Sequence, residues 1–209
     1  AERFCPSKNK HIPCIKCKPC SIVCGWGGAG AFSDGKLTLS PEVGGFLDEY
    51  ISKDRLHKRI RYVDDLYLRF GAPEKVYGDD EETITGIEKK AILADLRLIP
   101  SRIRHLGSGR TLEILEAMKE HLERKGVEVS IGSACEELLV KNGEAVGVRL
   151  SGGEVFTGKY IIVGPGREGS EWMVAEGKRL GLKTTVNPVD IGVRVELPAE
   201  VMEPLTAVV

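Results

Sequence analysis

Four cysteines stand close together near the start of the chain, at Cys14, Cys17, Cys20 and Cys24. Bacterial ferredoxins hold an iron–sulfur cluster with this C-x2-C-x2-C-x3-C spacing, and thiolates at similar spacings bind zinc. In two-cluster ferredoxins proline follows the fourth cysteine, whereas Gly25 follows it here and no second set of cysteines exists. Two hypotheses therefore stay open: an iron–sulfur or zinc site, or reduced, unligated cysteines in an ordered loop.

A glycine-rich loop, GWGGAGAFSDGKL at residues 25–37, follows the cysteines directly. Glycine has no Cβ, so this backbone can approach a phosphate group or a flavin ring closely. Ser33 adds a hydroxyl to the loop, Asp34 an acceptor for a ribose or a loop amide, and Lys36 a cation. From these residues alone, the loop either contacts a cofactor or is a tight irregular turn.

Another pair of glycines ends the apolar stretch KYIIVGPG, residues 159–166. A run that is apolar on both faces predicts a buried parallel strand over 160–166, and such strands deliver loops to ligands at their carboxyl ends. Gly164 and Gly166 are thus candidates for contact with an anion or a flavin. The alternative is an ordinary turn from a strand into a helix.

Few other side chains are candidates for chemistry. Arg102, Arg104 and His105 form a basic extended stretch that either faces a carboxylate substrate or is a solvated strand face. Cys135 begins a strand-like run and has no visible partner that would make it a nucleophile, so we expect it in the core. The chain shows no Ser-His-Asp set, Walker loop or carboxylate pair. No catalytic residue is therefore assigned, and a cofactor would supply the reaction chemistry.

The pattern of apolar residues predicts the elements that carry these side chains. Helices are expected over 45–70 with a break near 52–54, and over 79–96, 109–126 and 170–180. Short Val/Ile-rich runs over 127–166, separated by the turn pairs Asn142-Gly143 and Gly152-Gly153, predict an antiparallel meander. One more strand is expected over 189–197, whereas 1–24 should be irregular, 25–40 a loop and 97–106 extended.

Composition narrows the classes of function. Among the 209 residues, 30 basic and 31 acidic side chains leave a net charge of −1, and only 6% are aromatic, which argues against a nucleic-acid partner. No apolar run reaches the roughly eighteen residues of a membrane span, so no membrane partner is expected. Five of the six cysteines fall within the first 24 residues, unlike a disulfide scaffold. We therefore expect a reduced, cytoplasmic protein.

Three stretches resemble a known family: GWGGAGAFSDGKLTL at 25–39, RHLG at 104–107 and IIVGPGREG at 161–169. The family is that of the FAD-dependent dehydrogenases of uncharacterised substrate, related to the glutathione-reductase-like flavoproteins with two dinucleotide folds. The resemblance implies an α/β fold: a partial Rossmann-like FAD-binding domain over 1–182 with an antiparallel β-meander and a helical insertion over 43–96. Residues 183–209 would begin a second, substrate-side domain.

The resemblance begins after the family's first βαβ unit, which carries the G-x-G-x-x-G fingerprint and the acid that holds the ribose. We therefore expect a piece of a longer protein that is inactive on its own. The full protein would transfer hydride between an unknown small organic substrate and the flavin, with an electron-transfer partner. The resemblance implies that the cofactor contacts are Gly27, Gly28, Gly30, Ala31, Ser33, Asp34, Lys36, Gly164 and Gly166.

Two alternatives to this function stay open. In one, Cys14 to Cys24 form an iron–sulfur or zinc-binding module for electron transfer or folding. In the other, the chain is a folded, non-catalytic fragment that binds no cofactor, because the central βαβ unit is absent from it.

Overall fold

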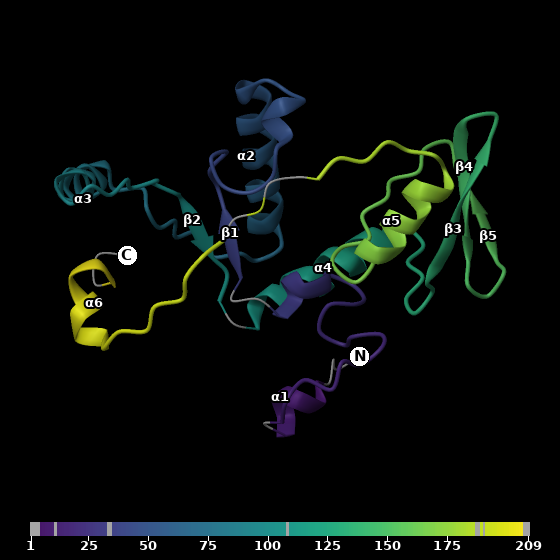
Figure 1. Cartoon of the computed structure of the whole chain (residues 1–209), viewed down its shortest axis with the longest axis horizontal. Coiled ribbons are helices and arrows are strands. Elements are labelled where there is room, and N and C mark those ends of the chain that lie inside the picture. The colour runs from purple at the N-terminus through teal and green to yellow at the C-terminus, as the bar shows by residue number, and fades with distance from the viewer. Residues whose placement is uncertain are drawn as a thin grey trace. The chain divides into compact units, whose positions relative to one another are not determined.

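The structure is a computed structural model that describes residues 5–10, 12–32, 35–107, 109–186, 189 and 191–206. It divides into two compact units. Unit 1 comprises Ala1–Gly30 with His121–Val189, and unit 2 comprises Ala31–Glu120 with Asp190–Val209. Helices and antiparallel sheets are both present, which confirms the predicted mixed α/β class (Figure 1).

Two helices of unit 2 are confirmed close to their predicted positions. Helix α2, Lys53–Arg69, begins where the Ser52 hydroxyl accepts a hydrogen bond from the Arg55 N–H. Helix α3, Glu81–Leu93, begins where the Asp80 carboxylate accepts from the N–H groups of its first turn. Side-chain oxygens at these positions satisfy amides that have no partner inside the helix. The helix expected before residue 52 is only a 3-10 turn, η2, Leu47–Glu49.

A short antiparallel pair of strands joins distant parts of unit 2. Strand β1, Lys36–Thr38, pairs with β2, Ile103–His105, with Lys36 opposite His105. Hydrogen bonds outside the strands extend this pairing at both ends, from Leu39 N–H to Arg102 O and from Leu106 N–H to Gly35 O. The predicted extended conformation around residue 103 is thus confirmed, whereas the strand at 36–38 lies in a stretch predicted to be a loop.

The core of unit 2 lies where β2 runs into the next helix, α4, Arg110–Arg124. Leu106 and Ile114 are buried there together with Ala72, and the side chains packed against them are Tyr67, Phe70 and Met118. Helix α4 was predicted, and its predicted end is confirmed: Gly126 has a φ of +83° and the Val127 N–H bonds back to Leu122 O. A glycine in this conformation is the usual C-terminal stop of a helix.

Unit 1 contains the predicted meander, a sheet with strand order β3-β4-β5. The strands are β3, Cys135–Lys141, β4, Glu144–Leu150, and β5, Val155–Thr157, all antiparallel. Asn142 and Gly143 turn the chain between β3 and β4 with φ values of +54° and +82°, as a two-residue hairpin turn requires. The Val-rich run at 127–131 was expected to belong to this meander, but it is not a strand.

Three further helices complete the described chain. They are α1, Pro6–Lys10, in a segment predicted to be irregular; α5, Ser170–Arg179, close to its predicted range; and α6, Ala199–Thr206, which was not predicted. A 3-10 turn, η1, Gly28–Phe32, lies in the glycine-rich loop. Among the described residues no helix has both the length and the apolar character that crossing a bilayer requires.

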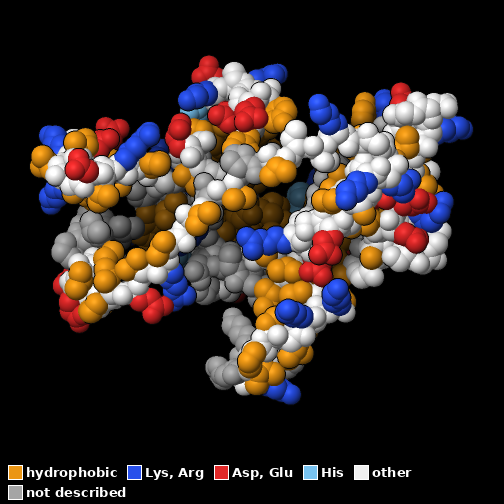
Figure 2. Space-filling view, in the orientation of Figure 1, with side chains coloured by type: hydrophobic (Ala, Val, Ile, Leu, Met, Phe, Trp, Pro, Cys, Tyr) orange, Lys and Arg blue, Asp and Glu red, His pale blue; other side chains and the backbone are white. Residues whose placement is uncertain are grey.

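Two predicted strands are wrong. The described residues of 160–166 and 189–197 form no strand, and the Ile162 and Val193 side chains are 96% and 86% exposed. Hydrophobic side chains recur along the extended segment that leads into α6 (Figure 2). An alternating pattern makes a strand only where a neighbouring strand takes up the backbone N–H and C=O groups. The parallel, Rossmann-like pairing expected for 160–166 is thus not observed.

Candidate cofactor site

The pairing of β1 with β2 brings together two of the three stretches that carry the family resemblance. Gly35 and Lys36 end the glycine-rich loop, and His105, Leu106 and Gly107 belong to RHLG. The Leu106 N–H donates to Gly35 O over 2.6 Å, which holds the two segments together at this corner of unit 2. Lys36 is exposed and His105 half-buried, so both side chains are accessible beside the joined backbones.

Gly35 is the residue that allows this close approach. Its backbone has a φ of +67°, and a Cβ at this position would lie 2.9 Å from the Leu106 Cβ and would collide with the Thr111 hydroxyl. Any other residue would therefore be strained in its backbone and would push apart the loop, β2 and the start of α4. Sequence reasoning did not single out Gly35, although it lies within the GKL string.

Helix α4 begins at the same corner. Gly107 and Gly109 both have a φ of +88°, and they carry the chain from β2 into the helix. The backbone N–H groups of Arg110 and Thr111 have no carbonyl partner within the helix, because they lie in its first turn. The Thr111 side chain is buried, with 5% of the residue exposed, and its hydroxyl has no hydrogen-bond partner in the part of the chain that the structure describes.

Arg104 is structural, so both expectations for it, substrate contact and a solvated strand face, are wrong. Its side chain is 4% exposed and forms a double ion pair with Asp64 of α2, at 2.6 Å from Nε to Oδ1 and 2.7 Å from Nη2 to Oδ2. Nη1 also donates to the carbonyl oxygens of Pro73 and Glu74, each over 2.6 Å. The hydrogen bonds to Asp64 raise the pKa of Arg104 above its ordinary value. Arg104 thus fixes β2, and with it the position of His105.

The other predicted cofactor residues fall in different parts of the chain. Gly27, Gly28 and Gly30 belong to unit 1, whereas the buried Ala31 and Lys36 belong to unit 2. Gly27 and Gly28 have φ values of +74° and +52°, in the left-handed region that favours glycine.

Ser33 and Asp34 lie outside the described residues. Gly164 and Gly166 belong to unit 1 and come just before α5, and Gly166 turns the chain with a φ of +64°. The corner at β1, β2 and α4 therefore contains Lys36 from the predicted set, together with Gly35 and Thr111, which sequence reasoning missed.

The clustered cysteines show no arrangement suited to a metal. Cys14 is exposed, Cys17, Cys20 and Cys24 are half-buried, and none of these four described cysteines forms a disulfide. Across the described ranges of the chain, no group of three or more His, Cys, Asp or Glu side chains is placed to hold a metal ion. The described geometry does not fit a metal ion or cluster, and we derive no chemistry through one.

Unit 2 also contains a cleft of about 520 Å³ at the opposite end of the β1–β2 pair. The residues that line it are Leu39, Ser40, Pro41, His57, Gly78, Asp79, Glu81, Ile84, Pro100 and Arg102. Its polar side chains carry both signs of charge and the charged ones are exposed, which leaves the cleft without a preference for one class of ligand. Arg102 thus lines a cleft, whereas its neighbour Arg104 is buried.

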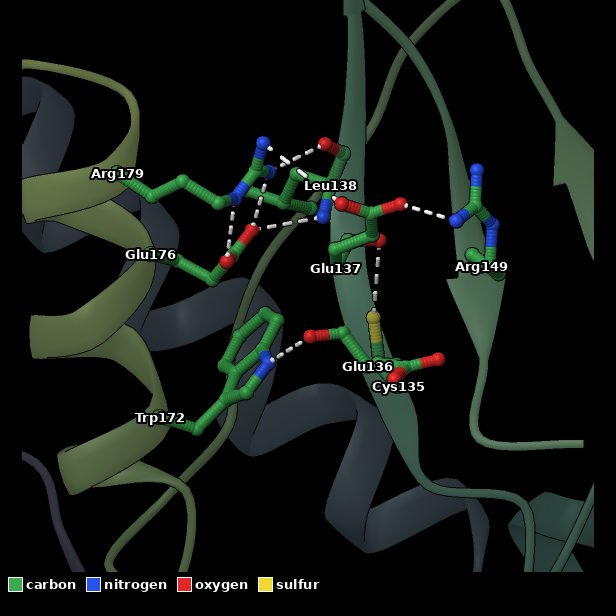
Figure 3. A network of polar contacts seen from close by, with 8 residues as sticks. All are labelled: Cys135, Glu136, Glu137, Leu138, Arg149, Trp172, Glu176 and Arg179. Carbon is green, nitrogen blue, oxygen red and sulfur yellow. Dashed lines mark hydrogen bonds and ion pairs between the residues drawn. The ribbon is translucent and has the colours of Figure 1, made fainter. Parts of the chain in front are cut away.

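A polar network in unit 1 holds α5 against β3 (Figure 3). The buried Glu176 carboxylate accepts hydrogen bonds from Arg179 and from the Leu138 N–H, and Arg179 also donates to Leu138 O. The hydrogen bond from Arg179, with that from Leu138, lowers the pKa of Glu176 to about 2. Trp172 Nε1 donates to Glu136 O over 2.8 Å. The residues of this network are paired with one another, which indicates a structural role.

Cys135 lies at the start of β3, and its thiol donates to Glu137 O over 3.6 Å. Desolvation, with the negative charge of Glu176, raises the pKa of this thiol above its ordinary value. A thiol that is held protonated is a poor nucleophile. Cys135 is half-buried, and the structure gives it no catalytic role.

Comparison with known proteins finds two partial similarities. No family model matches the chain. The chain is 41% identical over 49 residues to a hydroxyneurosporene desaturase of Rubrivivax gelatinosus, a match that covers 23% of the chain and 9% of the desaturase. It is 27% identical over 181 residues to an uncharacterised protein of Clostridium beijerinckii, covering 85% of the chain and 26% of that protein. The chain thus spans about a quarter or less of these relatives.

Proposed function

We propose that this chain is part of an FAD-dependent oxidoreductase and that the corner formed by β1, β2 and the start of α4 contacts the flavin nucleotide. The observation that carries the proposal is the pairing of Lys36 with His105. It joins the end of the glycine-rich loop to the RHLG stretch, and both stretches resemble the same flavoprotein family. The partial similarity to a desaturase supports the reaction class, since desaturation is an oxidation.

In this proposal the bound flavin supplies the redox chemistry by accepting or returning a hydride at its N5 atom. The chain's own residues bind and orient the cofactor. Gly35 keeps the loop close to β2 and α4, and the exposed Lys36 offers a positive charge beside the half-buried His105. At this corner the buried Thr111 hydroxyl has no hydrogen-bond partner among the described residues, which fits a site that binds a polar group.

The remaining predicted contacts are part of the proposal. Gly27, Gly28, Gly30 and Ala31 would border the cofactor through their backbone, as would Gly164 and Gly166 before α5. Ser33 and Asp34 would add a hydroxyl and a carboxylate. We assign no catalytic acid or base, and the substrate would be a small organic molecule that the flavin oxidises or reduces.

Titration of the purified chain with FAD tests the proposal. Flavin fluorescence should change on saturable binding, and in a 15N-labelled chain the amide signals of Lys36, His105 and Gly107 should shift. Gly35→Ala should weaken binding at least about tenfold, because a Cβ there separates the loop from β2 and α4.

Gly45→Ala is a matched control, since Gly45 is also in unit 2, has a φ of +77° and has open space where a Cβ would stand. Circular dichroism of both variants checks that they fold. A folded parent chain that shows neither saturable FAD binding nor shifts of these amides would refute the proposal. Equal FAD affinity of folded Gly35→Ala and Gly45→Ala would refute the placement of the flavin at this corner.

A further inference from the structure

We propose that the first turn of α4 is a phosphate-binding subsite, in which the Thr111 hydroxyl and the N–H groups of Arg110 and Thr111 take a phosphate group of the flavin nucleotide. The identity of the nucleotide rests on the proposed function. The anion site itself follows from the corner's own residues, so the two can fail separately.

The first observation is the Thr111 hydroxyl. It is buried and unpartnered within the described chain, although buried hydroxyls in folded proteins nearly always have a hydrogen-bond partner. Thr111 lies in the first turn of α4, so its hydroxyl lies close in the chain to the N–H groups of Arg110 and Thr111, which have no carbonyl partner within the helix. A phosphate oxygen is an acceptor that suits both kinds of donor.

The second observation is the helix itself. With 15 residues, α4 is long enough for its aligned peptide dipoles to place partial positive charge at its start. Glycines precede this start at positions 107 and 109, both with a φ of +88°, and a Cβ added at either glycine would meet no described atom within 4 Å. Backbone N–H groups at such a start commonly bind phosphate.

Side-chain charge at the corner also favours an anion. Arg110 is exposed in the first turn, and Lys36 is exposed opposite His105 on the paired strands. Glu113 also lies in the first turn of α4 and offsets part of this positive charge. Among the described residues Lys36, Arg110 and Glu113, the net charge is positive.

The test uses three ligands with the full chain: FAD, riboflavin, which has the same ring system without phosphate, and inorganic pyrophosphate. Thr111→Val removes the hydroxyl and keeps the shape of the side chain. It should weaken FAD and pyrophosphate binding about ten- to 150-fold in calorimetric titrations, the range expected for one hydrogen bond to a charged group. Riboflavin binding should change less than twofold.

Thr85→Val is the matched control, an exposed threonine of α3 in the same unit, and it should bind all three ligands as the parent does. Thr111→Val should also melt at a temperature at least equal to that of the parent, because it removes an unpartnered buried hydroxyl. A melting temperature of Thr111→Val below that of the parent would show that the hydroxyl has a partner inside the protein, and would contradict the proposal without any ligand.

The outcomes separate the two proposals. If the parent binds FAD and Thr111→Val binds FAD and pyrophosphate equally well, the phosphate subsite is refuted and the proposed function stands. If the parent binds pyrophosphate through Thr111 but binds neither FAD nor riboflavin, the subsite stands and the flavin function is refuted. A parent chain that binds none of the three ligands refutes both.

Discussion

Arg104 ties β2 to α2 through a buried ion pair, and replacing it with Met should destabilise unit 2. The substitution leaves the Asp64 carboxylate, which is 17% exposed, without its cation. It also leaves the carbonyl oxygens of Pro73 and Glu74 without a donor. Removing one partner of a buried ion pair costs about 3–5 kcal/mol. Because Glu74 is exposed and its carbonyl regains water, we expect a loss near the lower end, about 3 kcal/mol.

Urea denaturation followed by circular dichroism measures this free energy, and hydrogen exchange of the Leu106 amide reports on unit 2 locally. Arg102→Met is the control, since Arg102 is exposed and next to the same strand, and it should cost less than about 0.5 kcal/mol. The double variant Arg104→Met/Asp64→Leu should lose about 2 kcal/mol less free energy of unfolding than the sum of the losses of the two single variants, because neither charge is then left without its partner. A loss below about 1 kcal/mol for Arg104→Met, with unchanged exchange at Leu106, would refute the reasoning.

The pKa of the Glu176 carboxyl is lowered from 4.5 to about 2. The ionised carboxylate therefore contributes its full stabilisation above about pH 4.5, and this stabilisation is lost as the pH falls toward 2. That difference corresponds to at most about 3 kcal/mol, and since Arg179 is 42% exposed and screened by water we expect about 1–2 kcal/mol. Glu176→Gln should lose this part of the pH dependence in urea titrations between pH 5 and 2.5; an unchanged pH profile would contradict it.

Local signals in the sequence predicted helices α2 to α5 and the two hairpins of the β3-β4-β5 sheet, but not α1 or α6. The first turn of α3 is specified by Asp80, whose carboxylate accepts hydrogen bonds from the residues directly after it. The turn at Asn142-Gly143 depends only on the ability of these two residues to adopt a positive φ. Such elements are determined within a few residues. The predicted strand at 160–166 failed because a strand depends on a neighbour, which a periodic pattern alone does not supply.

The candidate site depended on contacts between distant segments, and these the sequence did not reveal. Three-residue strands carry too little pattern to be recognised, so the pairing of Lys36 with His105 was not expected. The requirement for glycine at Gly35 becomes visible only once Thr111 and Leu106 lie beside it. Arg104 looked like a surface residue because its partner, Asp64, lies 40 residues away in the sequence, on helix α2.

The contacts of α5 have a consequence for how the sheet of unit 1 can grow. Strand β3 is an outer strand, and the backbone N–H and C=O of Leu138 are already hydrogen-bonded to Glu176 and Arg179 (Figure 3). The carboxylate and guanidinium thus occupy the donor and acceptor that an added strand would use. An outer strand closed in this way cannot recruit another chain there, so any further strand would have to join beyond β5.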